Sequence, residues 1–543
     1  MSKRTRSAAL LAAVATVLTA CSGVASGPSG VAGAAYRITT DTPKPTRGID
    51  SFSWALYAEP LSLDYALAFD YPPNQVLANV CESLLRWNPD LTVSPGLAEK
   101  FANPTPTTWV YTIRQGVTFH DGSPLTAADV VASLRRHLDP RVGSYWASAF
   151  INVASIVQTG QHQVTVTLKR PDSLFNQFMA VTPGTIESAK TLARDGKAYG
   201  SASAGVNCTG PFSLASWKQG DSLTLKRYAG YWDASRLAKA GSVKFVFLAD
   251  PITRVNAWTA GEVDGGWLVP ANAYAKLTSS GAGTLYHGVN TTVVSEVVTR
   301  SSGVLADKRV RQALLMATDR AGLVKTGEQG VGDVATSMVS RSSWGGVSAG
   351  QLGQIIAKLP SYRRDVTAAK ALAKAAGVNG QRIVIATSPI IQSADAVTAA
   401  VAQAAKDIGL QPTIQTVSPA SYTAMFTDPA ARKGVDLMLT AWYTSLADPM
   451  DFYGALHTGQ FSNYGGWSNK AFDAAADLAV ATPLTDPRRP AIVAKAQQIA
   501  MDELPWLPMY TLPTSVWLGK RITGVKPSIN FLYYPWAASI GAN

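Results

Sequence analysis

Tyr111-Thr-Ile-Arg-Gln-Gly-Val-Thr-Phe-His-Asp-Gly-Ser-Pro-Leu-Thr-Ala-Ala-Asp-Val-Val131 combines a strand, a turn and a helix in one short stretch. The strand is predicted over residues 108–114, and Asp121-Gly122 predicts the turn. Thr126 and Asp129 have the spacing of a helical capping box, with Asp in place of the usual Glu, so a helix is predicted to begin there. This unit predicts a fold that mixes strands and helices.

Strands and helices continue to alternate along the chain. Predicted strands cover residues 51–57, 163–168, 222–227, 243–248, 382–387, 411–417 and 435–441, and predicted helices cover residues 73–85, 310–317, 365–376, 394–408 and 489–502. Regular alternation of this kind favours an α/β fold over an all-β or an all-α fold. A chain of 543 residues is long enough for two or three domains.

The N-terminus has the layout of a secretory signal peptide. Three basic residues are followed by an uncharged, mostly apolar run over residues 7–20. Cys21, directly after a small residue, resembles the cysteine of a bacterial lipobox, whose thiol takes lipid. Residues 1–20 are therefore expected to be a signal peptide, and residues 21–49 the lipidated cysteine and a flexible tether. A transmembrane anchor is less favoured because a bilayer core needs about 20 apolar residues. The other alternative is a plain signal peptide with a coincidental cysteine.

Charge and cysteine content narrow the class of protein. The chain has 48 basic and 36 acidic residues, but no dense basic stripe with interleaved aromatic residues. No nucleic-acid partner is therefore expected. Cys81 and Cys208 either form a disulfide or stay as two separate buried thiols. The five histidines do not have the spacing of metal ligands, so neither a metal nor another cofactor is expected.

A series of segments, in order along residues 50–540, is similar to the family 5 extracellular solute-binding proteins, the receptors of dipeptide, oligopeptide and nickel ABC importers. Besides the stretch quoted above, the segments are Glu59-Pro-Leu-Ser-Leu-Asp64, Asn79-Val-Cys-Glu-Ser-Leu-Leu85, Ser94-Pro-Gly-Leu-Ala-Glu99, Thr209-Gly-Pro-Phe212, Arg227-Tyr-Ala-Gly-Tyr-Trp232, Arg311-Gln-Ala-Leu-Leu-Met-Ala-Thr-Asp319, Ala441-Trp-Tyr443 with Asp448-Pro449, and Leu504-Pro-Trp-Leu-Pro508.

The resemblance implies a periplasmic-binding-protein-like fold of two lobes joined by a hinge. Lobe I would be discontinuous, with its core in residues 50–90, 207–287 and 508–543 and an inserted subdomain in residues 91–206. Lobe II would span residues 288–507. The chain would then cross between the lobes more than once, as hinge-bending proteins do.

The resemblance also implies a function without covalent chemistry. The protein would be a bacterial lipoprotein on the outer face of the cell membrane, a monomer in solution. It would bind a solute between its lobes and deliver it to an ABC permease, which works with separate ATPase subunits. A short peptide is the expected solute, and nickel chelates, haem-like compounds and oligosaccharides are the alternatives.

Eight residues are expected to bind the solute by their match to family positions. They are Phe69, Asp70 and Tyr71 of lobe I, Trp146 of the inserted subdomain, and Trp442, Tyr443, Ser445 and Asp448 of lobe II. Peptide-binding members hold an extended peptide largely through its backbone, and carry an Asp at the position of Ser445 that pairs with the peptide's α-ammonium. Another acid, such as Asp70, Asp448 or Asp451, must supply that charge here, or the solute has no ammonium at that place.

Each candidate residue also has a structural alternative. Asp448 has the position of a turn carboxylate that caps the next helix, and Trp442 is compatible with a place in the core. Phe69 and Tyr71 are compatible with a packed loop.

An extracellular serine hydrolase is the alternative from another class. Gly346-Val-Ser-Ala-Gly350 fits the Gly-x-Ser-x-Gly string, which needs a strand before the serine, a helix after it, and Asp and His partners downstream. The preceding residues predict a Gly/Ser loop, and only His457 lies downstream as a base. Ser348 is therefore expected to be a loop residue, and the protein is not expected to be an enzyme.

Overall fold

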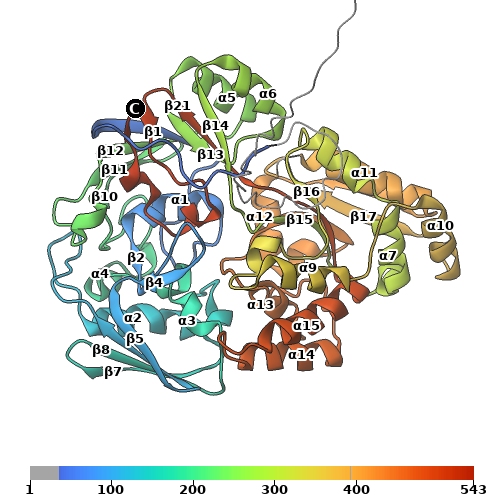
Figure 1. The fold of residues 1–543 in the computed structure, drawn as a ribbon, viewed down its shortest axis with the longest axis horizontal. Helices are drawn as coiled ribbons and strands as arrows, with labels where there is room; N and C mark the ends of the chain where they lie inside the picture. Colours follow the sequence, from blue (N-terminus) through green and yellow to red (C-terminus); the bar gives the residue numbers. More distant parts are fainter. Residues whose placement is uncertain (1–35, 392) are drawn as a thin grey trace, which may run out of the picture.

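The computed structural model describes residues 36–391 and 393–543, so the lipidation expected at Cys21 lies outside the described residues. Two lobes lie side by side, and the chain passes between them at one end (Figure 1). Lobe I holds the first and the last parts of the described chain, and lobe II holds the part between them. No helix in the described part is long and apolar enough to cross a membrane.

Lobe I is built on a seven-stranded mixed sheet. Its central strand β1 (Ile49–Leu56) runs parallel to β12 (Ala240–Phe247) and to β13 (Gly265–Trp267). The sheet continues with β11 (Ser222–Arg227) and β10 (Phe212–Lys218) beyond β12, and with β21 (Thr514–Gly519) and β14 (Gly283–Gly288) beyond β13. Trp54 of β1 is fully buried and packs on Trp536, with 4.4 Å between ring centroids. The C-terminal segment therefore packs on the central strand of lobe I.

The inserted subdomain of lobe I contains a four-stranded antiparallel sheet. The strand order is β5 (Ala98–Thr105), β6 (Thr108–Ile113), β8 (Gln163–Leu168) and β7 (Val153–Gly160). The predicted capping box is confirmed at the start of α2 (Ala127–Arg135). Thr126 Oγ1 accepts a hydrogen bond from the backbone N–H of Asp129, and the Asp129 carboxylate accepts one from Thr126 N at 2.9 Å.

Lobe II surrounds a six-stranded sheet. Its order is β16 (Asp333–Val334), β20 (Trp506–Thr511), β15 (Val293–Val298), β19 (Leu437–Trp442), β17 (Arg382–Thr387) and β18 (Gln411–Thr416). Its main helices are α7 (Lys308–Ala317), α10 (Val366–Ala375), α11 (Ala394–Asp407), α14 (Lys470–Ala481) and α15 (Arg489–Glu503). Every residue of β15 is buried, which places this strand in the core of the lobe.

The chain passes between the lobes at two adjacent places. Residues 289–292 connect β14 to β15, and residues 512–513 connect β20 to β21. The second passage corrects the expected boundary at residue 508, because β20 pairs with β15 of lobe II through Thr511. Gly288 lies at the first passage, where a Cβ atom would come within 1.9 Å of the Pro527 carbonyl oxygen, so only glycine fits there.

The expectation of a flexible tether over residues 21–49 is wrong for its last part, residues 36–48. Residues 36–48 pack on lobe I: Thr39 N donates to His287 O, and Thr42 Oγ1 donates to Val525 O at 2.7 Å. The sequence lacks apolar periodicity here because backbone and hydroxyl hydrogen bonds attach this segment, rather than a buried apolar face. The part of the expected tether before residue 36 lies outside the described residues.

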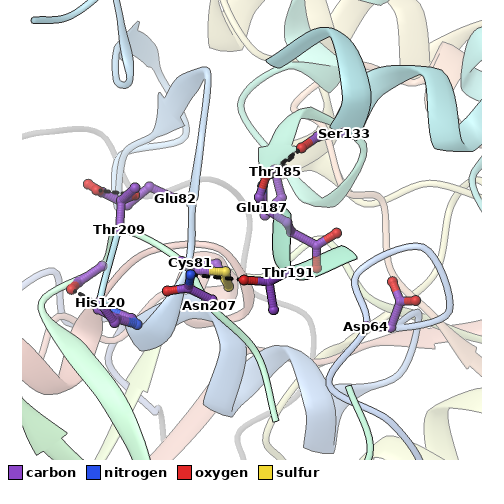
Figure 2. The surroundings of a disulfide bond; sticks show 12 residues. Asp64, Cys81, Glu82, His120, Ser133, Thr185, Glu187, Thr191, Asn207 and Thr209 are labelled. Carbon is purple, nitrogen blue, oxygen red and sulfur yellow. Dashed lines mark hydrogen bonds between the residues drawn. A yellow bond between two sulfur atoms is a disulfide. The ribbon is translucent and has the colours of Figure 1, made fainter. Parts of the chain in front are cut away.

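Cys81 and Cys208 form a disulfide at the base of the inserted subdomain. Cys81 directly follows α1 (Tyr71–Val80), and Cys208 lies where the chain returns from the insertion to the lobe I core. Figure 2 shows polar contacts around the bridge, between Thr209 Oγ1 and Glu82 at 2.9 Å and between Asn207 Nδ2 and Thr191 Oγ1 at 3.0 Å. The two cysteines are 127 residues apart in the sequence, one before the insertion and one after it. The disulfide therefore joins the two ends of the chain segment that contains the insertion.

Candidate functional site between the lobes

Residues expected to bind the solute meet across the boundary between the lobes. The Tyr443 hydroxyl of lobe II donates a hydrogen bond to Phe69 O of lobe I at 2.8 Å. The ring of Tyr71 lies edge-on to the ring of Tyr443, with 5.0 Å between centroids. Ser445 Oγ lies 2.9 Å from the hydroxyl of Tyr533, which belongs to the C-terminal part of lobe I. Phe69, Tyr71, Tyr443 and Tyr533 all remain partly exposed, although both lobes cover them.

The inserted subdomain holds the lobe I loop in place. Trp146 Nε1 donates to Ala68 O at 3.0 Å, and the ring of Tyr145 stacks on Phe69 with 4.3 Å between centroids. Trp146 is expected from the sequence to face the solute, but its indole N–H is occupied by the loop. Its neighbour Tyr145 reaches toward lobe II, where it lies edge-on to Phe461 at 6.5 Å.

Asp70 caps the N-terminus of α1, a position that favours Asp because its side chain accepts a backbone N–H. Its Oδ1 accepts hydrogen bonds from Tyr71 N at 2.7 Å and from the Tyr57 hydroxyl at 3.2 Å. Desolvation raises the pKa of Asp70, and these two hydrogen bonds offset part of that rise. Within residues 36–391 and 393–543, no basic side chain forms an ion pair with Asp70.

Five tyrosines from both lobes lie within electrostatic range of Asp70. They are Tyr57, Tyr71, Tyr145, Tyr422 and Tyr443. Burial raises the pKa of each of these phenols, and the charge of Asp70 raises each pKa further. These tyrosines therefore form a neutral, largely aromatic surrounding for one carboxyl group.

The loop of lobe II that contains Ser445 is held by Asp451. The Asp451 carboxylate accepts the backbone N–H groups of Ser445 at 2.5 Å and Leu446 at 3.1 Å. Desolvation raises the pKa of Asp451 to about 7. Its role in the described structure is to fix the loop, because its hydrogen bonds go to the main chain of that loop.

Asp448 has a structural role, which corrects its expected place in the binding site. Its Oδ1 accepts the backbone N–H of Met450 at 2.9 Å, at the start of the next helix, as the alternative interpretation of this residue predicts. Its Oδ2 pairs with Arg489 at 2.6 Å, and only 4% and 8% of the two side chains are exposed. This carboxylate is therefore already neutralised inside lobe II.

Trp442 belongs to an aromatic cluster of lobe II. It lies edge-on to Trp506 at 5.3 Å, and Phe452 and Tyr464 complete the cluster. The Trp442 side chain remains partly exposed, and its ring contacts within residues 36–391 and 393–543 are all with residues of lobe II, which agrees with the alternative place in the core.

A second contact between the lobes lies on α14 and α15. We call it the distal contact, formed by residues 170–173 of the inserted subdomain against these two helices. Ser173 N donates to Val480 O at 2.8 Å, and Arg170 pairs with Asp477 at 2.9 Å. Arg489 donates to Ser173 Oγ at 3.2 Å, so the same guanidinium contacts Asp448 and the opposite lobe. The described conformation therefore has its two lobes closed on each other.

Comparison with known proteins agrees with this two-lobed arrangement. The family model of the bacterial extracellular solute-binding proteins, family 5 (middle part), matches residues 92–464. The chain is a family 5 solute-binding protein. Members of this family are extracytoplasmic receptors of ABC importers and not enzymes, so the expected family, fold and receptor role are confirmed.

Relatives of this family 5 protein include the glutathione-binding protein GsiB of Salmonella typhi. The two are 27% identical over 488 residues, which cover 87% of this chain and 91% of the relative. The solved structure of AgaA in complex with agropinic acid, from A. tumefacien R10, covers 91% of this chain and 99% of its own at 22% identity, with a TM-score of 0.80. DppA from Helicobacter pylori in complex with the peptide STSA covers 91% of this chain and 98% of its own at 19% identity, with a TM-score of 0.80. The two structures show that the fold is shared.

Ser348 of this family 5 protein is the N-cap of a helix. Its side chain accepts the backbone N–H of Gln351, and a short 3₁₀ turn, Arg341–Ser343, precedes it in place of a strand. The geometry of a hydrolase elbow is therefore not met, and the loop prediction is confirmed. Within residues 36–391 and 393–543, no cluster of His, Cys, Asp and Glu has the arrangement of a metal site.

Sequence reasoning missed four aromatic residues of the site. Tyr57 directly follows the central strand β1, and binding residues in α/β sheets tend to lie at carboxyl ends of strands, so a signal for it was present. Tyr145 directly precedes Trp146, so the motif that pointed to Trp146 could also have pointed to Tyr145. Tyr422 and Tyr533 had no local signal, because only the fold brings them to the boundary between the lobes.

Proposed function

We propose that this receptor encloses a short peptide between its lobes and delivers it to an ABC permease. The observation that carries the proposal is the meeting of Phe69 and Tyr71 with Tyr443, and of Tyr533 with Ser445, across the boundary. Extended peptides suit a site that offers backbone groups and aromatic side chains. The glutathione-binding protein GsiB and DppA, which was solved in complex with the peptide STSA, agree with this ligand class.

Lobe closure would link binding to delivery. We propose that lobe I with its insertion and lobe II move as bodies about residues 289–292 and 512–513, and that the solute favours the closed form. The contacts of Tyr443 with Phe69 and of Ser173 with Val480 would form on closure.

A peptide ligand is expected to stabilise the protein without being consumed. At a concentration 100-fold above Kd, a bound peptide adds about 2.7 kcal/mol to the free energy of unfolding. A thermal-shift screen of di- to pentapeptides, with mass spectrometry of the recovered peptide, measures both properties. No stabilisation by any peptide would reject the peptide class, and peptide turnover would reject the receptor role.

We further propose that Cys21 is lipidated and keeps a monomeric receptor at the membrane surface. The layout of residues 1–21 supports this, as does the packing of residues 36–48 on lobe I, which leaves only the segment before residue 36 to connect the fold to a lipid.

Cys21→Ser is expected to move the protein from the membrane fraction to the medium of its bacterial host, because one acyl-bearing residue would be its only anchor. Immunoblots of both fractions measure this. Ser29→Ala is the matched control, since it changes a residue of the same segment outside the lipobox and leaves the Cys81–Cys208 disulfide intact. An unchanged membrane fraction for Cys21→Ser would contradict the anchor.

A further inference from the structure

Three carboxyl groups near the boundary between the lobes are candidates for the acid that replaces the missing Asp at Ser445. Asp448 is neutralised by Arg489 at 2.6 Å. Asp451 is committed to the backbone N–H groups of Ser445 and Leu446. Asp70 and Asp451 each keep one oxygen that accepts no hydrogen bond from residues 36–391 and 393–543, since both hydrogen bonds of Asp70 end on Oδ1 and both of Asp451 end on Oδ2. Asp70 is the better candidate because Asp451 fixes the loop that contains Ser445, whereas Asp70 lies among tyrosines of both lobes.

The surroundings of Asp70 lack a counter-charge but are rich in aromatic faces. Tyr71 and Tyr443 lie edge-on to each other at 5.0 Å, and Phe69 and Tyr145 are stacked at 4.3 Å. Aromatic faces attract cations within about 6 Å of their centroids, and a carboxylate among them adds a direct charge. Asp70 has two hydrogen bonds but no counter-charge within residues 36–391 and 393–543. Removing a carboxylate from water without a counter-charge is costly, so an organic cation would complete this arrangement.

We propose that Asp70, within the tyrosines of both lobes, binds the ammonium group of the solute. This inference rests on the proposed function only in placing the solute between the lobes. The acid of lobe II that binds the ammonium in peptide-binding members is thereby replaced by an acid of lobe I, which lies at the N-cap of α1.

Because the acid lies in lobe I instead of lobe II, the contacts with the ammonium group would form in a definite order. Lobe I supplies Asp70, Tyr57, Tyr71 and Tyr145, and it can bind the ammonium while the lobes are apart. Tyr443 of lobe II then covers the same place and donates its hydroxyl to Phe69 O. Closure would therefore complete the aromatic surrounding of a cation that lobe I already holds.

Isothermal titration with trialanine and with N-acetyl-trialanine tests the proposal on the full mature chain. Acetylation removes the charge, and Asp70→Asn removes the matching charge while keeping a cap, because Asn and Asp are about equal at N-caps. Each change is expected to weaken binding by roughly 10- to 150-fold, the value of a charge-assisted hydrogen bond. Acetylation should have little further effect in Asp70→Asn, because both changes remove the same interaction.

Asp250→Asn is the matched control. Asp250 caps α5 (Pro251–Ala260) of lobe I, where its side chain accepts the backbone N–H of Thr253, and a proline lies in the first turn of both helices. This control is expected to bind trialanine as the unmodified protein does. Unchanged binding in Asp70→Asn would overturn the assignment and leave the peptide function intact.

Failure of every peptide to bind would reject the peptide class and is distinguishable from failure of the Asp70 assignment. In that case native mass spectrometry of the solute that co-purifies with the chain decides. A solute with a protonatable or quaternary nitrogen, retained by the unmodified protein and lost from Asp70→Asn, supports the assignment. A solute without such a nitrogen, or one retained equally by Asp70→Asn, overturns it.

Discussion

Replacing Cys81 and Cys208 together by alanine is expected to lower the free energy of unfolding by about 2–5 kcal/mol. The bridge encloses a sequence separation of 127 residues, so it restricts a large loop in the unfolded chain. The chain-entropy account gives about 5 kcal/mol for a loop of this size, which is an upper value because native strain and residual structure reduce it. Urea unfolding followed by tryptophan fluorescence, without reductant, measures the loss.

A reductant supplies the control for the disulfide prediction. Dithiothreitol should bring the unmodified protein to the urea midpoint of the double variant and leave the double variant unchanged. Equal midpoints for the two proteins in the absence of reductant would show that the bridge adds nothing to stability.

Arg489→Met is expected to destabilise lobe II by about 3–5 kcal/mol, because it leaves the Asp448 carboxylate buried without its partner. The guanidinium also donates to Thr482 O at 3.1 Å and to Ser173 Oγ at 3.2 Å. The variant therefore loses one hydrogen bond of the distal contact as well. Calorimetry of the unfolding transitions measures the effect on stability.

The preceding residue offers a matched control. Arg488 also pairs with an aspartate, Asp486 at 2.7 Å, but 81% of its side chain is exposed. Arg488→Met is expected to change stability by no more than about 0.5 kcal/mol, because exposed ion pairs contribute little. The double variant Arg489→Met/Asp448→Asn should recover part of the loss. Equal effects of Arg488→Met and Arg489→Met would contradict the assigned cost of the unpaired carboxylate.

Local signals in the sequence were enough to place many elements of the fold. The strands at residues 163–168, 222–227 and 382–387 have the predicted bounds, because side-chain alternation and flanking turns are local properties. The helix predicted over residues 73–85 ends earlier, at Val80. Cys81 is extended there, and β2 (Glu82–Ser83) pairs with β9 (Thr185–Ile186), a partner far along the chain.

Only part of the candidate site could be predicted from the sequence. Motif positions gave Phe69, Asp70, Tyr71 and Tyr443, which the structure brings together. The pairing of Asp448 with Arg489 could not be foreseen, because it joins residues far apart in sequence. Tyr533 was missed for the same reason: its ring reaches the boundary only because the C-terminal segment returns to lobe I.

The two passages between the lobes continue a single antiparallel ribbon. Gly288 pairs with Thr514 at the end of lobe I, and Val293 pairs with Thr511 at the start of lobe II. Lobe II is thus inserted into what would otherwise be the turn of a hairpin formed by β14 and β21. Such a hairpin needs only a short turn to close, so lobe I would keep every strand of its own sheet if lobe II were exchanged for another domain. A reporter domain could therefore be inserted between β14 and β21. It would be connected to lobe I at the same two points as lobe II is.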